Sequence, residues 1–213
     1  MLIRSWDRGS EAEWRAFLAG RDFGVLAANG AGEDAWPVLV PTHFLLDTER
    51  EEILLHLAAP NPLFTAVAAD PRVTLMVTDD YAFIPGYWRP GQTPTSHYTA
   101  VQFECEAQVV NDAAGKAEIL NRQLAHFQPE AVEPRVAPGA EPFGPRLSGI
   151  RGLRLTVRRV RAKFKYDDKV PVEQQLAQAE RLAERAAPGD AGARAQLLRR
   201  NAARGGCPLP AAD

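Results

Sequence analysis

The sequence predicts a mainly β chain with helices, an α+β protein in which an antiparallel barrel carries peripheral helices and a C-terminal helical tail. About six short β-type runs follow one another with few helices between them, which argues against a doubly wound parallel sheet. The last of these runs slips in phase near Arg158, as strands do where a barrel turns a corner. Residues 172–203 are rich in Ala, Gln, Glu and Arg and are predicted to be helical.

The first predicted element is a helix over residues 11–19, preceded by a capping box formed by Ser10 and Glu13. Two β-type runs, 23–27 and 36–46, flank a turn-rich Asn-Gly-Ala-Gly segment and predict a hairpin. A third run covers residues 53–58. Asn61 and Pro62 then start a short helix, with Asn as the N-cap and Pro at the first helical position.

The second half of the chain continues this pattern. The predicted elements are a buried strand at 73–78, a loop at 83–96, an alternating strand at 98–109, a helix capped by Asp112 and ending near 127, and a Pro- and Gly-rich loop at 129–145. Apolar residues then alternate up to Val157 and resume out of phase at Val160, which predicts a β-bulge or bend at Arg158-Arg159. Pro188-Gly189 breaks the C-terminal helix.

With 213 residues, 46% of them hydrophobic, the chain can form a core without disulfides. We expect a barrel domain over 1–170, a helical extension of the same domain over 171–204 and a flexible tail over 205–213. The charged N-terminus lacks a secretory h-region, and no apolar stretch reaches the length of a membrane span, so a cytoplasmic protein without a membrane anchor is predicted. Cys105 and Cys207 lie outside any CxxC pattern and are expected to be free thiols.

The sequence carries no strong catalytic signature. It has no GxSxG, Walker or GxGxxG motif, and its four histidines do not have metal-site spacing, so the catalytic residues stay unknown and no metal site is predicted. Residues 1–145 hold ten Arg and Lys against twenty Asp and Glu, whereas 146–206 hold fifteen against six. This asymmetry predicts either a surface for an anionic partner or a solvated helical tail.

Three stretches have the chemistry of a binding site. Pro41-Thr42-His43 interrupts an apolar strand with a hydroxyl and an imidazole, and His56 lies on a strand that leads directly into the helix start at Asn61. Unpaired N–H groups and the helix dipole at such a start attract phosphate. Lys163 and Lys165 alternate on a strand, so both side chains point to one side and can bind an anion together.

Together these segments resemble the PaiB family, flavin-binding proteins often labelled negative transcriptional regulators and related to the pyridoxamine 5'-phosphate oxidase-like split barrels. The resemblance covers roughly residues 1–200 in the family's order. The stretches that carry it are PTHFLLD, ILLHLAAPNPLF, residues 81–88 with their proline, PTSHYTAVQFECEAQVV, RLSGIRGLRL and AKFKYDDK followed by a helix.

The resemblance implies an antiparallel FMN-binding split barrel, a homodimer and FMN at the dimer interface. It also implies the cofactor-binding residues, which are Thr42, His43, His56, Ala58, Asn61, Tyr98, Lys163 and Lys165. Three departures leave reduced or lost FMN binding open as an alternative. Ala59 replaces a basic residue, Ser96 and His97 replace Trp-Asn, and Asp167 and Asp168 place two carboxylates beside the lysines.

The resemblance implies an FMN-binding regulatory protein, and a flavin-dependent oxidoreductase is the alternative, because one fold can serve both functions. In the second case the proton carriers would come from His43, His56, His97 and Tyr98. Direct DNA binding through the basic residues of 151–165 is a third hypothesis. No DNA-binding motif accompanies them, and the net charge of −2 argues against a general nucleic-acid binder.

Overall fold

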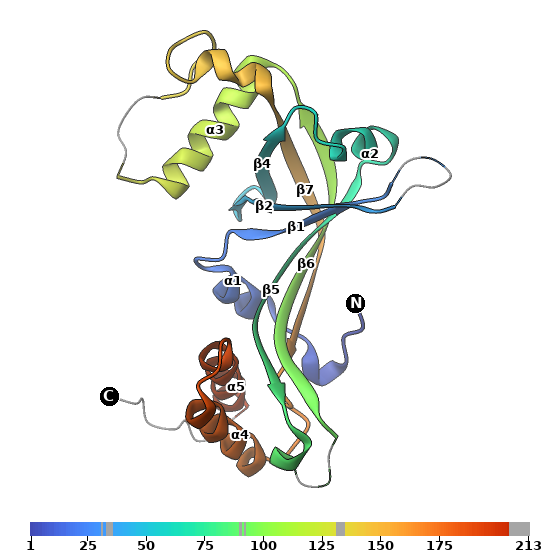
Figure 1. Ribbon diagram of the computed structural model, residues 1–213, viewed down its shortest axis with the longest axis vertical. Helices are drawn as coiled ribbons and strands as arrows, with labels where there is room; N and C mark the ends of the chain where they lie inside the picture. The colour runs from blue at the N-terminus through green and yellow to red at the C-terminus, as the bar shows by residue number, and fades with distance from the viewer. Residues whose placement is uncertain (31, 33–35, 90, 92, 131–134, 205–213) are drawn as a thin grey trace. The chain divides into compact units, whose positions relative to one another are not determined.

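The computed structural model describes residues 1–30, 32, 36–89, 91, 93–130 and 135–204 (Figure 1). The described chain forms these helices: α1 (Glu11–Leu18), α2 (Leu63–Ala69), α3 (Ala113–Phe127), α4 (Val172–Arg185) and α5 (Asp190–Ala203), with three short 3-10 helices η1 (Ser5–Asp7), η2 (Gly86–Trp88) and η3 (Gly144–Gly149). It forms these strands: β1 (Phe23–Ala28), β2 (Val38–His43), β3 (Leu45–Asp47), β4 (Glu52–Ala58), β5 (Arg72–Ile84), β6 (Thr95–Val110) and β7 (Ile150–Lys165). Cys207 and the predicted tail at 205–213 lie outside the described residues.

The strands form one seven-stranded sheet in the order β2-β1-β5-β6-β7-β4-β3. The pairs β1–β2, β1–β5, β3–β4 and β4–β7 are antiparallel, so the predicted α+β class with an antiparallel sheet is confirmed. The predicted hairpin is confirmed as well, with Phe23 opposite His43 and Ala28 opposite Val38.

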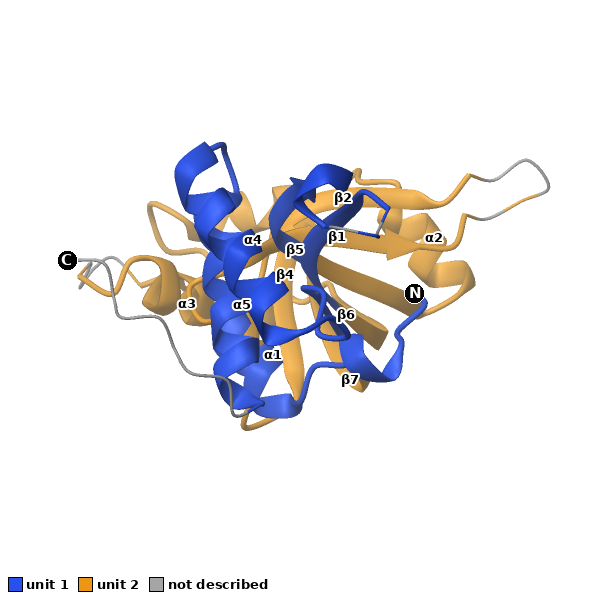
Figure 2. Cartoon of the chain, turned by 90° about the horizontal axis from the view of Figure 1, so that it is seen from below, with its two compact units in different colours: residues 1–17, 78–101, 161–213 blue, residues 18–77, 102–160 orange. Residues whose placement is uncertain are grey.

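The chain divides into two compact units (Figure 2). Unit 1 comprises residues 1–17, 78–101 and 161–213, and unit 2 comprises 18–77 and 102–160. The three longest strands, β5, β6 and β7, contribute residues to both units. Each unit therefore contains segments that are far apart in the sequence.

In unit 2, α3 packs against β4 because both present apolar side chains to each other. One buried cluster is formed by Leu54 of β4, Val110 of β6 and Ile119 of α3. Gly152 of β7 permits this close packing, since a Cβ atom there would lie 2.6 Å from the Ile119 Cδ1 atom. Asp112 caps α3 as predicted, and its carboxylate accepts a hydrogen bond from the Gly115 amide.

In unit 1, the predicted capping box of α1 is confirmed, because the Ser10 and Glu13 side chains each accept the other residue's backbone N–H. The Phe17 ring packs edge-to-face on Phe164 of β7, with centroids 6.0 Å apart. The predicted C-terminal helix is divided into α4 and α5 at Pro188-Gly189, as expected, and the two helices pack against each other (Figure 1).

Two boundaries differ from the sequence prediction. The run 36–46 is split into β2 and β3 at Phe44, a buried residue whose amide donates to the Asp22 carbonyl. The strand expected to end at 78 continues to Ile84, and β6 begins at Thr95, so both ends of the predicted loop 83–96 are strand. Tyr81 and Phe83 of β5 are exposed although they are aromatic. The sequence therefore shows no alternation of polar and apolar residues in this part of the strand, even though burial alternates there.

The phase slip predicted at Arg158-Arg159 is present within a continuous β7. Glu104 and Glu106 lie two residues apart on β6 and so share one face. The consecutive residues Arg158 and Arg159 bind Glu106 and Glu104 respectively, each at 2.5 Å. Two neighbouring side chains therefore reach the same face, which regular strand alternation does not allow.

Candidate functional site

The residues predicted to bind the cofactor fall into two groups, one in each unit. Thr42, His43, His56, Ala58 and Asn61 belong to unit 2. The other group, in unit 1, consists of Tyr98, Lys163 and Lys165.

In unit 2, β2 and β4 bring His43 and His56 together. Their rings lie edge-to-face with centroids 5.4 Å apart, and the Phe127 ring of α3 also lies edge-to-face with His43, at a centroid distance of 5.2 Å. Burial and the neighbouring His56 lower the pKa of His43, although Asp22 opposes this effect. His43 is thus an uncharged imidazole at neutral pH, a group able to accept or donate a proton.

A third histidine joins this group from α3. His126 contacts the Phe127 ring at 4.7 Å, and its Nε2 atom lies 3.2 Å from the Asp22 carboxylate. His126 was not among the residues predicted from the sequence to form the site. Gln123, one helical turn earlier, hydrogen-bonds His56 and was not expected to take part.

The segment from β4 into α2 offers fewer free N–H groups than its sequence suggests. The Asn61 side chain accepts the Leu63 amide, but α2 begins one residue later than predicted, at Leu63 with Pro62 in the N-cap position. The amides of Phe64, Thr65 and Ala66 also have acceptors within the chain. Because Pro62 has no N–H, phosphate would have to replace existing bonds at this helix start.

Ala59 stands where the PaiB family usually has a basic residue. A basic side chain from another strand nevertheless lies beside α2. Arg151 of β7 pairs opposite Leu57 of β4, and its guanidinium lies 5.2 Å from the centre of the Phe64 ring. The sequence analysis considered Arg151 only as part of a DNA-binding surface. Its position could be found only from the β4–β7 register, since the two strands are distant in the sequence.

In unit 1, Lys163 and Lys165 line one cavity of about 260 Å³. The cavity residues are Leu2, Arg4, Trp6, Asp7, Arg89, Thr93, Thr95, Lys163, Lys165, Asp167 and Lys169. Five of them are basic and two are acidic, so the cavity favours an anion. We call it the basic pocket.

The two lysines are held by neutral as well as charged partners. The Lys163 ammonium donates to the Leu2 carbonyl at 3.0 Å and lies 3.8 Å from the Asp7 carboxylate. Lys165 donates to the Thr95 hydroxyl at 2.8 Å. Burial and the nearby Lys163 lower the pKa of Lys165, so an anion beside both ammonium groups would be stabilised.

Tyr98 of β6 lies beside both lysines. Its ring centre is 5.5 Å from the Lys163 Nζ atom and 5.8 Å from the Lys165 Nζ atom, within cation–π range. The three residues of the unit 1 group are thus close neighbours, whereas strand alternation predicted only that the two lysines share one side.

The carboxylates that follow the lysines are taken up by arginines. Asp167 forms a two-point bond with buried Arg89 at 2.6 and 2.9 Å. Asp168 binds Arg200 of α5 at 2.5 Å. Burial raises the pKa of Asp167, but contacts with His97 and Arg89 outweigh this and bring it to about 2. Neither carboxylate therefore needs Lys163 or Lys165 as its partner.

His97, one of the departures, lies behind the basic pocket in unit 1. Its side chain is fully buried, and its Nε2 atom is 3.7 Å from Asp167, too far for a hydrogen bond. Within the described residues neither ring nitrogen has a hydrogen-bond partner. Burial lowers the pKa of His97, with Asp167 opposing, so the ring is expected to be neutral at pH 7.

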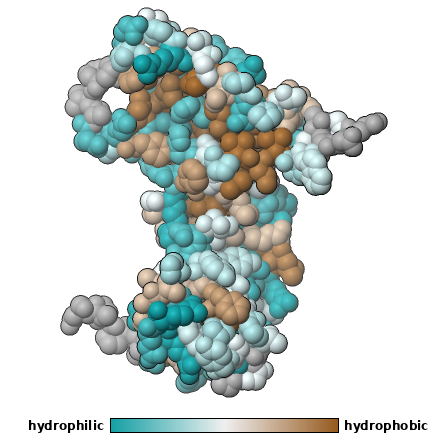
Figure 3. All heavy atoms as spheres, viewed as in Figure 1, coloured by the Kyte–Doolittle hydropathy of each residue, from teal (hydrophilic) through white to brown (hydrophobic). Residues whose placement is uncertain are grey.

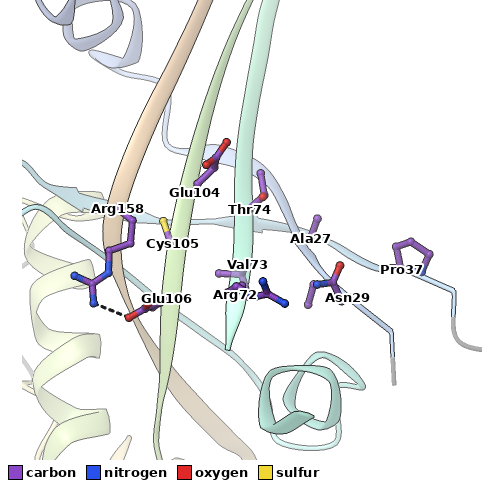
Figure 4. Close-up of a pocket in the computed structure, with 11 residues that line it drawn as sticks. Ala27, Asn29, Pro37, Arg72, Val73, Thr74, Glu104, Cys105, Glu106 and Arg158 are labelled. Atoms are coloured by element: carbon purple, nitrogen blue, oxygen red, sulfur yellow. Dashed lines mark hydrogen bonds and ion pairs between the residues drawn. The ribbon is translucent and has the colours of Figure 1, made fainter. Parts of the chain in front are cut away.

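A larger cavity of about 500 Å³ lies in unit 2 at the ends of β1 and β5 (Figure 4). It is lined by Ala27, Ala28, Asn29, Pro37, Arg72, Val73, Thr74, Glu104, Cys105, Glu106 and Arg158. Its charged side chains are already paired, for example Arg158 with Glu106 and Arg72 with Asp70. Burial raises the pKa of Cys105 to about 12, so its thiol is unreactive.

The described residues provide no cluster of three His, Cys, Asp or Glu side chains suited to a metal ion. In the same part of the chain, no helix has both the length and the apolar character needed to cross a membrane.

Comparison with known proteins gives a family and a set of similar folds. A family model described as "Putative FMN-binding domain" matches residues 1–159. This match ends before Lys163, so four of the eleven residues that line the basic pocket lie outside it. No curated protein sequence matches the chain.

Three solved structures illustrate the similarity of fold. An FAD and heme binding protein from Mycobacterium smegmatis is 15% identical, with a TM-score of 0.58 over 79% of this chain and 77% of that one. A conserved hypothetical protein from Mycobacterium tuberculosis is 21% identical, with a TM-score of 0.54 over 80% and 94%. A flavocytochrome from Azotobacter vinelandii is 17% identical, with a TM-score of 0.54 over 76% and 74%.

Proposed function

The chain belongs to the family described as "Putative FMN-binding domain", and we propose from this that it binds FMN and acts as a regulatory protein of the PaiB type. The observation that carries the proposal is the basic pocket. Two partly buried lysines line this pocket, which is large enough for a phosphate group, and the Tyr98 ring lies beside both lysines. When bound, FMN would supply a redox-active ring system, and the chain would supply position and polar contacts.

Each residue group has a separate role in this proposal. Lys163 and Lys165 hold the anionic phosphate through charge-assisted hydrogen bonds. The unit 2 group, comprising Thr42, His43, His56, Ala58 and Asn61, makes the polar and aromatic contacts to the flavin. Because each group is complete within its own unit, each can be tested separately by substitution.

We also propose a homodimer, formed through the sheet face that carries His43. Strand pairing places Phe23, Leu39 and Met76 on one face, since residues opposite each other in a sheet point to the same side. These three side chains are 61%, 63% and 40% exposed. Figure 3 shows apolar side chains gathered over β1 and β2, a patch of the kind that marks interfaces.

The direct test of the proposed function is the visible absorption of the purified protein before and after addition of FMN. We expect a flavin spectrum that copurifies, or fluorescence quenching that saturates near one FMN per chain. No flavin signal together with no saturable quenching would refute FMN binding.

The lysine pair gives a site-specific prediction. Lys163→Ala combined with Lys165→Ala removes two charge-assisted bonds, and we expect FMN affinity to fall by at least about tenfold. Arg158→Ala with Arg159→Ala is the matched control, because it removes the same charge from the same strand outside the basic pocket. Unchanged FMN affinity in the lysine variant would remove these residues from the site.

A flavin-dependent oxidoreductase is the second candidate function. The observation that favours it is the His43–His56 pair, in which the lowered pKa of His43 supplies a neutral imidazole able to carry a proton. Reduction of bound flavin by an electron donor, slowed by His43→Phe at unchanged FMN occupancy, would support this function over regulation alone.

The structure offers little support for direct DNA binding through β7. Arg154 is bound to Glu52 and Glu118, and Arg158 and Arg159 are bound to carboxylates of β6. Such pairing lowers the positive charge available to phosphates. A gel shift at low salt should show no complex with duplex DNA.

A further inference from the structure

A hydrogen bond between α3 and β4 determines where the proton of His56 lies. The His56 Nδ1 atom is 2.7 Å from the Oε1 atom of Gln123. Gln123 is only 2% exposed, so solvent does not compete for its amide group. A neutral imidazole carries one proton on either ring nitrogen, and the partner of Nδ1 decides which.

The orientation of the Gln123 amide is set by a second bond. Its Nε2 atom donates to the Leu54 backbone carbonyl at 3.4 Å. A carbonyl only accepts hydrogen bonds, so the amide NH2 must face Leu54 and the amide oxygen must face His56. Since that oxygen also only accepts, the Nδ1 atom of His56 must carry the proton.

The opposite ring nitrogen is then left with a free lone pair. Among the described residues, Nε2 of His56 has no hydrogen-bond partner, and His56 is only half-buried. A lone pair accepts an N–H or O–H group, and it repels the oxygens of an ionised phosphate, which have no proton to donate.

We infer that Gln123 fixes His56 as the Nδ1-protonated form, so that Nε2 accepts a hydrogen bond from an N–H or O–H group of the flavin. This inference rests on the proposed FMN binding and makes Gln123 a positioning residue. It also separates the roles of the two groups, because His56 selects a donor whereas Lys163 and Lys165 select an anion.

FMN offers two kinds of hydrogen-bond donor, the imide N–H of its ring system and the hydroxyls of its ribityl chain. N3-methyl FMN lacks the imide N–H, whereas lumiflavin lacks both the ribityl hydroxyls and the phosphate. Comparing the two ligands with wild-type and His56→Leu protein identifies which donor is used.

The proton position is tested without any ligand by 15N NMR of histidine-labelled full-length protein at pH 8. The His56 signals are assigned by their loss in His56→Leu. We expect a protonated Nδ1 and an unprotonated Nε2 in the wild type. Gln123→Met should lose this preference, whereas Gln123→Glu keeps an oxygen opposite Nδ1 and should retain the proton there. A wild-type His56 protonated at Nε2 would overturn the inference.

The effect on binding is tested by FMN titration of the same variants. Loss of one hydrogen bond in Gln123→Met should weaken FMN about three- to tenfold. Gln128→Met, at the exposed end of α3, is the matched control and should bind as the wild type does. In His56→Leu, either the affinity penalty of N3-methyl FMN should disappear or that of lumiflavin should shrink to the part caused by its missing phosphate. A penalty unchanged by His56→Leu for both ligands would contradict a contact to Nε2.

The two proposals can fail separately. If FMN does not bind the wild type at all, the proposed function fails and the ligand contact falls with it, while the NMR result still decides the role of Gln123. If FMN binds normally but Gln123→Met changes neither the proton position nor the affinity, only this inference is refuted.

Discussion

At the scale of single residues, the charge of the basic pocket depends on Asp7. Asp167 is neutralised by Arg89, but Asp7 lies 3.8 Å from Lys163 and competes with any anion for that lysine. Burial raises the pKa of Asp7 despite the opposing effect of Lys163 and Lys165. The ionised form is therefore disfavoured in the folded protein, and this penalty disappears as the pH falls through the raised pKa.

This predicts that anion binding in the basic pocket becomes tighter on acidification. As Asp7 becomes protonated, Lys163 is released, and sulfate, whose charge does not change over this range, should bind more tightly as the pH falls through the raised pKa of Asp7 than at pH 8. Asp7→Asn should bind about tenfold more tightly than the wild type at pH 8 and should lose most of the pH dependence. Isothermal titration across this range measures both effects, and a variant with the wild-type profile would show that Asp7 does not control the pocket.

At the scale of elements, the N-cap of α3 connects local sequence to the site. Asp112 binds the Gly115 amide at 2.7 Å, and α3 carries both Gln123 and Phe127 against the histidines. Asp112→Ala should lower the free energy of unfolding by about 1 kcal/mol, and Asp112→Ser should restore most of it. Urea unfolding followed by circular dichroism measures the difference. Equal loss in both variants would mean that the cap bond is not the cause.

Most elements of this chain could be predicted because their signals are local. The Ser10–Glu13 capping box and the Pro188-Gly189 break act within a few residues and lie where the pattern indicated, and the Asn61-Pro62 start is one residue off. The prediction for β5 was wrong at its C-terminal end because exposed aromatic residues occupy positions that are usually polar. The phase slip at Arg158 was detectable because apolar alternation resumes out of register after it.

The contacts that build the candidate site were much harder to predict. Lys163 and Lys165 share a pocket because alternation alone places them on one side of β7. The arginines that neutralise Asp167 and Asp168 come from distant segments, and so does Gln123 beside His56. These partners depend on tertiary packing, for which a single sequence has no local signal.

At the scale of the whole molecule, the exposed apolar face predicts the state of assembly. Leu39→Lys with Met76→Lys places two charges in a face that we expect a second copy to cover, so the variant should be monomeric where the wild type is dimeric. Light scattering coupled to size exclusion measures this. Tyr87→Lys is the control, since Tyr87 is 79% exposed but lies in unit 1. A wild-type protein that is monomeric yet binds FMN would refute the interface.

The pairing of β4 with β7 also determines how the protein can be made. β4 is followed by more than a third of the chain before its partner begins, and the Arg8–Lys163 bridge joins the N-terminal segment to β7. During synthesis, the edge of the apolar strand β4 that pairs with β7 therefore stays unpaired until β7 has been translated. Translation pauses before residue 150 should promote aggregation, and a chaperone that shields strand edges should raise the yield of folded protein.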